Sequence, residues 1–307
     1  GRRRADGLSR RALRGGEIAA ACKAKLHGLK QQMAGDFRLN VKLSAACSTD
    51  ILTFCKNVKV GSGRVNACLL EHEEKLESAD CKAEVNRMGR TVTSDIEYNQ
   101  PIYHACVTHV RDGSICGRDT LGVPPMSALP LGTQPVRGRV LACLKANFTQ
   151  ITRLELERMA TGDAAPNGTN PNACEDGVRK LMVVQTRDVT YNFNLVRVCA
   201  YEMKAPEFCG TLDHGSGVVI SCLVEKRDLH GFSHKCRHAV EVEYESHTSD
   251  IELMVAMKKA CKADLKITCG YNQTWLNAKP DIANTVEDNT RYREHAGSYV
   301  NCLRATP

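Results

Sequence analysis

Residues 81–106 read CKAEVNRMGRTVTSDIEYNQPIYHAC, and residues 236–261 read CRHAVEVEYESHTSDIELMVAMKKAC. Each stretch has cysteines 25 residues apart and an aspartate 14 residues after the first cysteine. The same spacing of two cysteines and an aspartate begins at Cys22 and at Cys174. Matches at fixed offsets in four places are typical of a tandem repeat, here with a unit of roughly 60 residues.

All sixteen cysteines of the 307-residue chain belong to these four copies. The copies hold Cys22, Cys47, Cys55, Cys68; Cys81, Cys106, Cys116, Cys143; Cys174, Cys199, Cys209, Cys222; and Cys236, Cys261, Cys269, Cys302. An even number of widely spaced cysteines without a CxxC pair favours disulfides over structural zinc, and so indicates an oxidising compartment. Three glycosylation sequons, at Asn147, Asn167 and Asn272, are consistent with that compartment.

The stretch between the first and second cysteine has a helical pattern. Apolar residues follow the aspartate at intervals that mark one helix face, as Ile96, Tyr98 and Ile102 do in the second copy. We therefore predict two antiparallel helices in each copy. The aspartates suit the N-cap of the second helix, because a carboxylate there accepts unpaired backbone N–H groups; they are Asp36, Asp95, Asp188 and Asp250.

A third helix is expected after a glycine that lies five residues before each fourth cysteine, where a turn needs positive φ. The second and third cysteines, 8 or 10 residues apart, are too far apart on one helix to pair. First–second with third–fourth pairing is favoured, and the other pairings stay open. The predicted fold is all-α: a tandem array of four disulfide-stapled small helical bundles, stacked end to end.

The copies give the expected organisation of the chain: a basic, disordered extension over 1–21, then repeats over 22–80, 81–173, 174–235 and 236–307. The arginines of the extension could also form a polyanion-binding or processing tail. Inserts at about 117–137 and 270–295 are interpreted as tolerated surface loops or as gene-model errors, although long loops can bind ligands. ITRLELERMA (151–160) is expected to be helical. No signal peptide or membrane span is visible, so the chain is expected to be a fragment of a longer exported protein.

Motifs of catalysis are absent from the sequence: there is no GxSxG, HExxH, P-loop or dinucleotide fingerprint. His230, His234 and His238 lie at helical spacing beside Cys236, but Gly231 interrupts them and the repeat already uses the cysteine. We therefore expect no catalytic, cofactor or metal site and no nucleic-acid partner. The chain is predicted not to be an enzyme.

Three elements together resemble one known family: C-x24-C, the ACSTDILTFC form at 46–55, and the G-x-V-x-x-C-L form at 63–69. They are similar to the cysteine-rich repeat of the Golgi apparatus protein 1 family, also called cysteine-rich fibroblast growth factor receptor or E-selectin ligand 1. The resemblance implies the lumenal side of a type I Golgi membrane glycoprotein, with its membrane span outside this fragment. It also implies binding to secreted proteins such as fibroblast growth factors, an influence on their trafficking, and glycan-dependent selectin binding. A saposin-like lipid-binding protein is the alternative.

Overall fold

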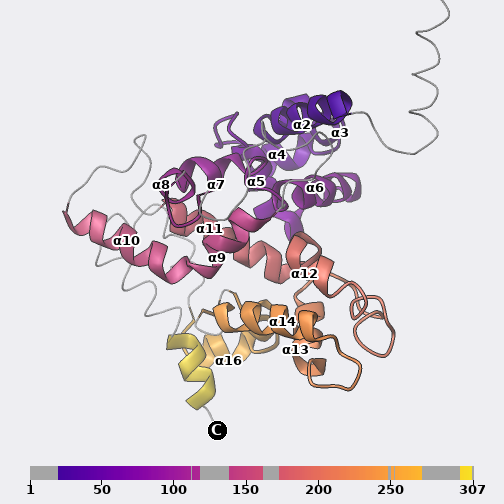
Figure 1. Ribbon diagram of the computed structural model, residues 1–307, viewed down its shortest axis with the longest axis vertical. Coiled ribbons are helices and arrows are strands. Elements are labelled where there is room, and N and C mark those ends of the chain that lie inside the picture. Colours follow the sequence, from indigo (N-terminus) through magenta and orange to yellow (C-terminus); the bar gives the residue numbers. More distant parts are fainter. Residues whose placement is uncertain are drawn as a thin grey trace, which may run out of the picture.

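A computed structural model shows an all-helical molecule (Figure 1). It describes residues 20–111, 113–117, 138–161, 173–247, 250–251, 253–271 and 298–305, and no strand occurs among them. The basic extension, most of both inserts, Asn167 and Asn272 lie outside these residues. The all-α prediction is confirmed, whereas the boundaries of the four predicted domains stay a prediction.

Each copy contributes three kinds of helix. The first helices carry the first cysteines and are α2 (Ala20–Gly35), α6 (Ala79–Val92), α11 (Ala173–Arg187) and α14 (His234–His247). The second helices end at the second cysteines and are α3 (Val41–Ala46), α7 (Gln100–Ala105), α12 (Phe193–Val198) and α15 (Val255–Ala260). The third helices are α5 (Arg64–Glu71), α9 (Arg139–Ala146), α13 (Val218–Lys226) and an unlabelled helix over 298–305.

Shorter elements fill the connections. They are η1 (Phe37–Leu39), α4 (Ser48–Phe54), η2 (Glu73–Lys75), α8 (Val107–Val110), η5 (Val189–Tyr191) and α16 (Lys262–Ile267). The second copy adds α10 (Phe148–Thr161), which contains the stretch expected to be helical from the sequence. None of the described helices combines the length and hydropathy that a bilayer crossing requires.

The disulfides show that the favoured cysteine pairing is half wrong. Third and fourth cysteines pair within each copy, as Cys55–Cys68, Cys116–Cys143, Cys209–Cys222 and Cys269–Cys302. First and second cysteines do not pair with each other. Instead, the second cysteine of each of the first three copies pairs with the first cysteine of the next, as Cys47–Cys81, Cys106–Cys174 and Cys199–Cys236. Cys22 and Cys261, both expected in disulfides, are free thiols in the structure.

Helix packing explains this pairing. The expected hairpin would have paired the first and second helices of one copy. The structure instead packs each second helix against the first helix of the following copy: α3 against α6, α7 against α11, and α12 against α14. The hydrophobic clusters follow the same arrangement, because Cys81, Val85 and Met88 of the second copy are buried with Leu43 and Cys47 of the first. The copies are therefore interlocked, and none is stapled as a closed unit.

The third helix begins at a left-handed glycine, as the sequence indicated. Gly63, Gly138 and Gly217 have φ values of 69°, 78° and 71°. A Cβ on Gly63 would lie 3.0 Å from both the Ala34 carbonyl oxygen and the Pro101 Cδ atom. Pro101 belongs to α7, so the glycine also allows close approach of the next copy.

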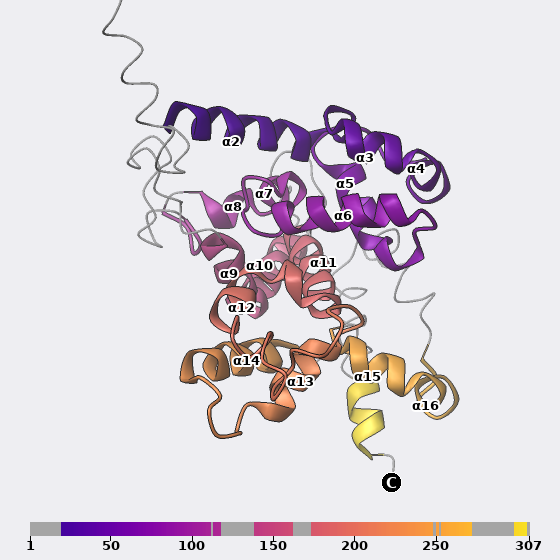
Figure 2. The same cartoon turned by 90° about the vertical axis from the view of Figure 1, so that its right-hand side faces the viewer.

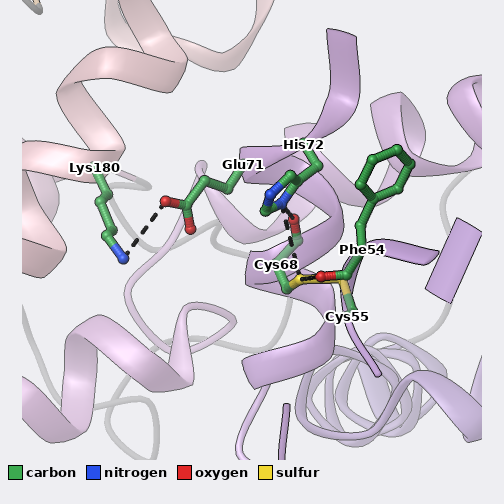
Figure 3. The surroundings of a disulfide bond; sticks show 6 residues. All are labelled: Phe54, Cys55, Cys68, Glu71, His72 and Lys180. Carbon is green, nitrogen blue, oxygen red and sulfur yellow. Dashed lines mark hydrogen bonds and ion pairs between the residues drawn. A yellow bond between two sulfur atoms is a disulfide. The ribbon is translucent and has the colours of Figure 1, made fainter. Parts of the chain in front are cut away.

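An aromatic pair lies beside the disulfide Cys55–Cys68 of the first copy (Figure 3). The Cys68 Sγ atom lies 3.6 Å from the Phe54 carbonyl oxygen. The rings of Phe54 and His72 stack with their centroids 5.4 Å apart. Beside them, Glu71 points toward Lys180 of α11, with 3.6 Å between carboxylate and ammonium groups (Figure 3).

That ion pair is the exposed edge of a larger contact between the first and third copies. Arg187 of α11 is buried and donates to the Leu70 carbonyl oxygen at 2.7 Å and to the Glu71 carbonyl oxygen at 3.3 Å. Its guanidinium also lies 3.6 Å from the Glu73 carboxylate. The array is consequently not stacked end to end with neighbour contacts alone, because copies two apart also touch. α2 and α16 lie at opposite ends of the molecule (Figure 2).

Candidate binding groove

A groove of about 990 Å³ lies where the second, third and fourth copies meet. Its walls come from α9, α11 and α14, with contributions from the starts of α10 and α12. At the groove α14 packs against α12, and Arg179 of α11 reaches Asp250 of the fourth copy. Ligand sites are commonly concave surfaces between structural units, so this groove is the candidate binding site of the described chain.

Two ion pairs from different copies fix the walls of the groove. The Lys145 ammonium donates to Gln185 Oε1 at 2.8 Å and to Glu243 Oε1 at 2.6 Å. The Arg179 guanidinium donates to Asp250 Oδ2 at 2.7 Å. All of these charged side chains are less than one-sixth exposed, so the charges inside the groove are already paired by the protein.

The rim of the groove is different, because its basic side chains are exposed. His234, Lys235 and His238 stand on the first turns of α14 and line the opening. Apolar surface lies next to them at Val242, which is 46% exposed. A rim on which basic side chains outnumber the exposed acidic Glu245, beside apolar surface, suits a protein ligand with an acidic contact region.

The histidines do not form the metal site considered from the sequence. Cys236, the sulfur ligand that such a site would need, is bonded to Cys199. Two buried clusters with metal-ligand residue types do occur among the described residues: His109 with Glu155 and Cys174, and Glu202 with Cys199 and Cys236. Their sulfurs belong to disulfides, and a metal needs a thiolate, so neither cluster is a metal site as built.

The carboxylates in these clusters hold backbone groups instead. Glu155 of α10 accepts the Cys174 N–H at 3.3 Å and the Glu175 N–H at 3.0 Å, in the first turn of α11. Burial raises the pKa of the Glu155 carboxyl to about 7, against the lowering effect of the Glu175 N–H. Burial also lowers the pKa of the neighbouring His109, whose Nε2 atom has no hydrogen-bond partner in the structure.

The first and third copies use an acidic residue three positions after the second cysteine for the same purpose. Asp50 accepts the Glu77 N–H at 2.9 Å, and Glu202 accepts the Ser233 N–H at 2.9 Å. Both carboxylates are buried where the chain enters the first helix of the next copy. In the second copy His109 occupies this position, and Glu155 from the additional helix supplies the carboxylate.

The four aspartates expected as caps lie in short turns before the second helices. Asp36 and Asp188 are N-caps of η1 and η5, and Asp95 accepts the N–H two residues ahead. The α-helices themselves begin four residues later, at caps that the sequence analysis missed: Asn40, Asn99 and Asn192. The signal was present, because an asparagine follows the aspartate by four residues in three copies.

Of the three sequons, only that at Asn147 falls on described residues. Asn147 is the C-cap of α9 and is partly exposed, and its Nδ2 atom donates to the Cys143 carbonyl oxygen at 2.9 Å. Glycosylation at Asn147, Asn167 and Asn272 stays a prediction.

Comparison with known proteins supports the resemblance read from the sequence. A family model described as a cysteine rich repeat matches residues 20–77 and 172–229, which are the compact first and third copies. Over 277 residues, or 88% of this chain, the chain is 24% identical to Golgi apparatus protein 1 of Cricetulus griseus and 25% identical to that of Homo sapiens. The same alignments cover 19% of those proteins, so the chain spans about a fifth of the length of the curated relatives it matches. No solved structure matches.

Proposed function

We propose that this chain, which carries cysteine-rich repeats similar to those of Golgi apparatus protein 1, is part of the lumenal binding scaffold of a Golgi membrane glycoprotein. The observation that carries the proposal is the alignment over 88% of the chain. The seven disulfides support it, because such bridges form and persist in the oxidising secretory pathway. The scaffold is not an enzyme in this proposal and uses no cofactor.

The proposed ligands are fibroblast growth factors and related secreted proteins, whose trafficking the scaffold affects. The groove between the second, third and fourth copies is the proposed contact site. Its inner charges are paired, so a ligand would meet the exposed rim at His234, Lys235 and His238. Selectin binding is proposed to depend on glycans.

Surface plasmon resonance tests the proposal by measuring the binding of the purified chain to a panel of fibroblast growth factors. We expect saturable binding that weakens at least tenfold when Lys235→Glu reverses the charge of the lysine on the rim. The matched control is Lys204→Glu, which makes the same charge change on an exposed residue of the third copy outside the groove.

Two results would contradict the proposal. Equal weakening by the rim variant and by Lys204→Glu would show that net charge alone controls binding, so the groove would have no part in it. Absence of saturable growth-factor binding, together with strong binding of the chain to phospholipid vesicles, would favour the saposin-like alternative. For the compartment, the epitope-tagged full-length protein is expected to colocalise with a Golgi marker.

A further inference from the structure

The buried cluster of the second copy, formed by His109, Glu155 and Cys174, contains three types of metal ligand. One ligand atom from each residue lies within 4.8 Å of the other two. His109 is 5% exposed, Glu155 is 2% exposed and Cys174 is 0% exposed. Neighbouring ligands of a tetrahedral zinc ion lie roughly 3.3–3.8 Å apart, since zinc–ligand bonds are about 2.0–2.3 Å long. Small side-chain movements would therefore bring these three atoms to one ion.

Only the sulfur of this cluster is unable to bind a metal in the oxidised protein. Cys174 is bonded to Cys106, and a sulfur ligand must be a thiolate. The two Glu155 oxygens each accept one backbone N–H and keep a further lone pair. The His109 Nε2 atom is buried without a hydrogen-bond partner, which is unfavourable in a protein interior. The cluster thus holds a nitrogen for which the oxidised protein supplies no partner.

The corresponding cluster of the third copy lacks the imidazole. It consists of Cys199, Glu202 and Cys236, of which the two cysteines are bonded to each other. Glu202 accepts a backbone N–H at 2.9 Å, and neither of its oxygens is buried without a hydrogen-bond partner. His109 stands at the position of Glu202 in the repeat, and the carboxylate of the second copy comes from the additional helix α10. The second copy therefore has an imidazole in addition to the carboxylate and the two sulfurs.

We propose that opening of the Cys106–Cys174 disulfide converts the cluster of the second copy into a zinc site. His109 Nε2, a Glu155 oxygen and the Cys174 thiolate bind the ion, and the Cys106 thiolate takes the fourth position. Zinc accepts thiolate, imidazole and carboxylate ligands in tetrahedral geometry. Cys174 lies in the first turn of α11, so the ion would hold α11 to the second copy in place of the disulfide.

The opening step is a reduction, and a dithiol is the proposed reductant. The dithiol gives up two electrons and two protons and becomes a disulfide, while Cys106 and Cys174 become two thiols. Both thiols release their protons when they bind Zn²⁺. Reoxidation restores the Cys106–Cys174 bond and releases the ion. The site is occupied only in the reduced chain, and it does not depend on the proposed growth-factor binding.

Cobalt binding to a variant in which Cys174 is permanently free tests the proposal. The parent is the full chain with Cys22→Ser and Cys261→Ser, whose other cysteines are all in disulfides. Cys106→Ser in this parent leaves the Cys174 thiol beside His109 and Glu155. We expect one equivalent of Co²⁺ to bind with a thiolate-to-cobalt charge-transfer band, which Zn²⁺ abolishes and which the parent does not show. Absence of the band from a variant with unchanged circular dichroism would overturn the proposal.

Two further variants separate this site from any buried thiol near a carboxylate. Cys199→Ser in the same parent is the matched control, because it frees Cys236 beside Glu202 without an imidazole. His109→Gln added to Cys106→Ser removes the imidazole and keeps the thiol and the carboxylate. Both should bind Co²⁺ at least tenfold more weakly than Cys106→Ser alone. Equal affinities would show that the imidazole has no part in binding, and the proposed site would be wrong.

A second measurement decides the question if Cys106→Ser changes the circular dichroism. The parent is treated with a phosphine, which takes oxygen from water as it reduces disulfides to thiols and binds zinc more weakly than a dithiol. Alkylation with and without Zn²⁺, followed by peptide mapping, measures the protection of each thiol. We expect zinc to slow the alkylation of Cys106 and Cys174 at least tenfold relative to Cys199 and Cys236. Equal protection of the two pairs, or no protection, would refute the site.

Discussion

Replacement of Glu155 by glutamine should remove a defined part of the pH dependence of stability. Glu155 is 2% exposed and ties α10 to the first turn of α11 through two backbone N–H groups. Burial raises the pKa of its carboxyl from 4.5 to about 7. Glutamine has almost the same shape and carries no titrating proton, so the variant isolates the ionisation.

The sign of the effect follows from proton binding. Between the two pKa values the folded state holds more protons on this group than the unfolded state, so stability falls as pH rises. The stabilising contribution is complete below pH 4.5 and is lost as pH rises through about 7. At about 1.4 kcal/mol for each pKa unit, the shift corresponds to a loss of about 3 kcal/mol in the free energy of unfolding.

Urea unfolding followed by circular dichroism at pH 5, 6, 7 and 8 measures this loss. The disulfides stay intact, and Cys22→Ser with Cys261→Ser prevents thiol oxidation. We expect the free energy of unfolding of Glu155→Gln to decline less with pH than that of the parent, by about 3 kcal/mol across the range. His109 titrates in both proteins, so its own contribution largely cancels in the difference.

Glu157→Gln provides the matched control, because Glu157 lies on the same helix and its side chain is 62% exposed. This control should follow the parent closely at every pH. If Glu155→Gln showed the same decline as the parent, the carboxyl of Glu155 would titrate alike in the folded and unfolded chain. The assignment of a buried, protonated cap on α11 would then be wrong.

Two further predictions concern the region where the first, second and third copies meet. Gly89→Ala should destabilise the chain by about 1–3 kcal/mol, because the new Cβ would lie 2.6 Å from Tyr191 Cε1. The control Gly28→Ala has open space around it and should be neutral or slightly stabilising. Equal melting temperatures of the two variants would contradict this packing. Arg187→Met should cost about 3 kcal/mol at pH 8, because it leaves Glu73 buried without its partner. Burial raises the pKa of Glu73, so this cost should shrink in urea titrations at lower pH, and a cost independent of pH would exclude the ion pair as its source.

The sequence was sufficient for the parts of the fold that depend on local chemistry. The glycine before each third helix predicted positive φ, which Gly63, Gly138 and Gly217 have. Apolar periodicity predicted helices on both sides of the aspartate. The third cysteine, 8 or 10 residues beyond the second, could not pair with it on one helix, which favoured the observed third–fourth pairing while other pairings stayed open.

The first–second pairing was wrong because a constant spacing fits two topologies. A fixed step of 25 residues suits a hairpin closed by its own disulfide, and it suits equally a segment whose two ends are bonded to neighbouring copies. Only tertiary packing separates these possibilities: Val85 of α6 is buried with Leu43 of α3, in the preceding copy. The groove could not be foreseen for the same reason, since Lys145 and Glu243 meet across 98 residues of sequence.

The disulfides between copies also determine how the chain would respond to proteolysis and to mechanical force. A protease that cleaves between Cys106 and Cys174, in either long connection of the second copy, leaves both fragments covalently joined. The stretches 82–105, 175–198 and 237–268 are spanned by no disulfide of the structure. Tension applied to the ends would therefore be borne by the backbone of these three stretches. They could extend, whereas the segments between them are held closed by disulfides.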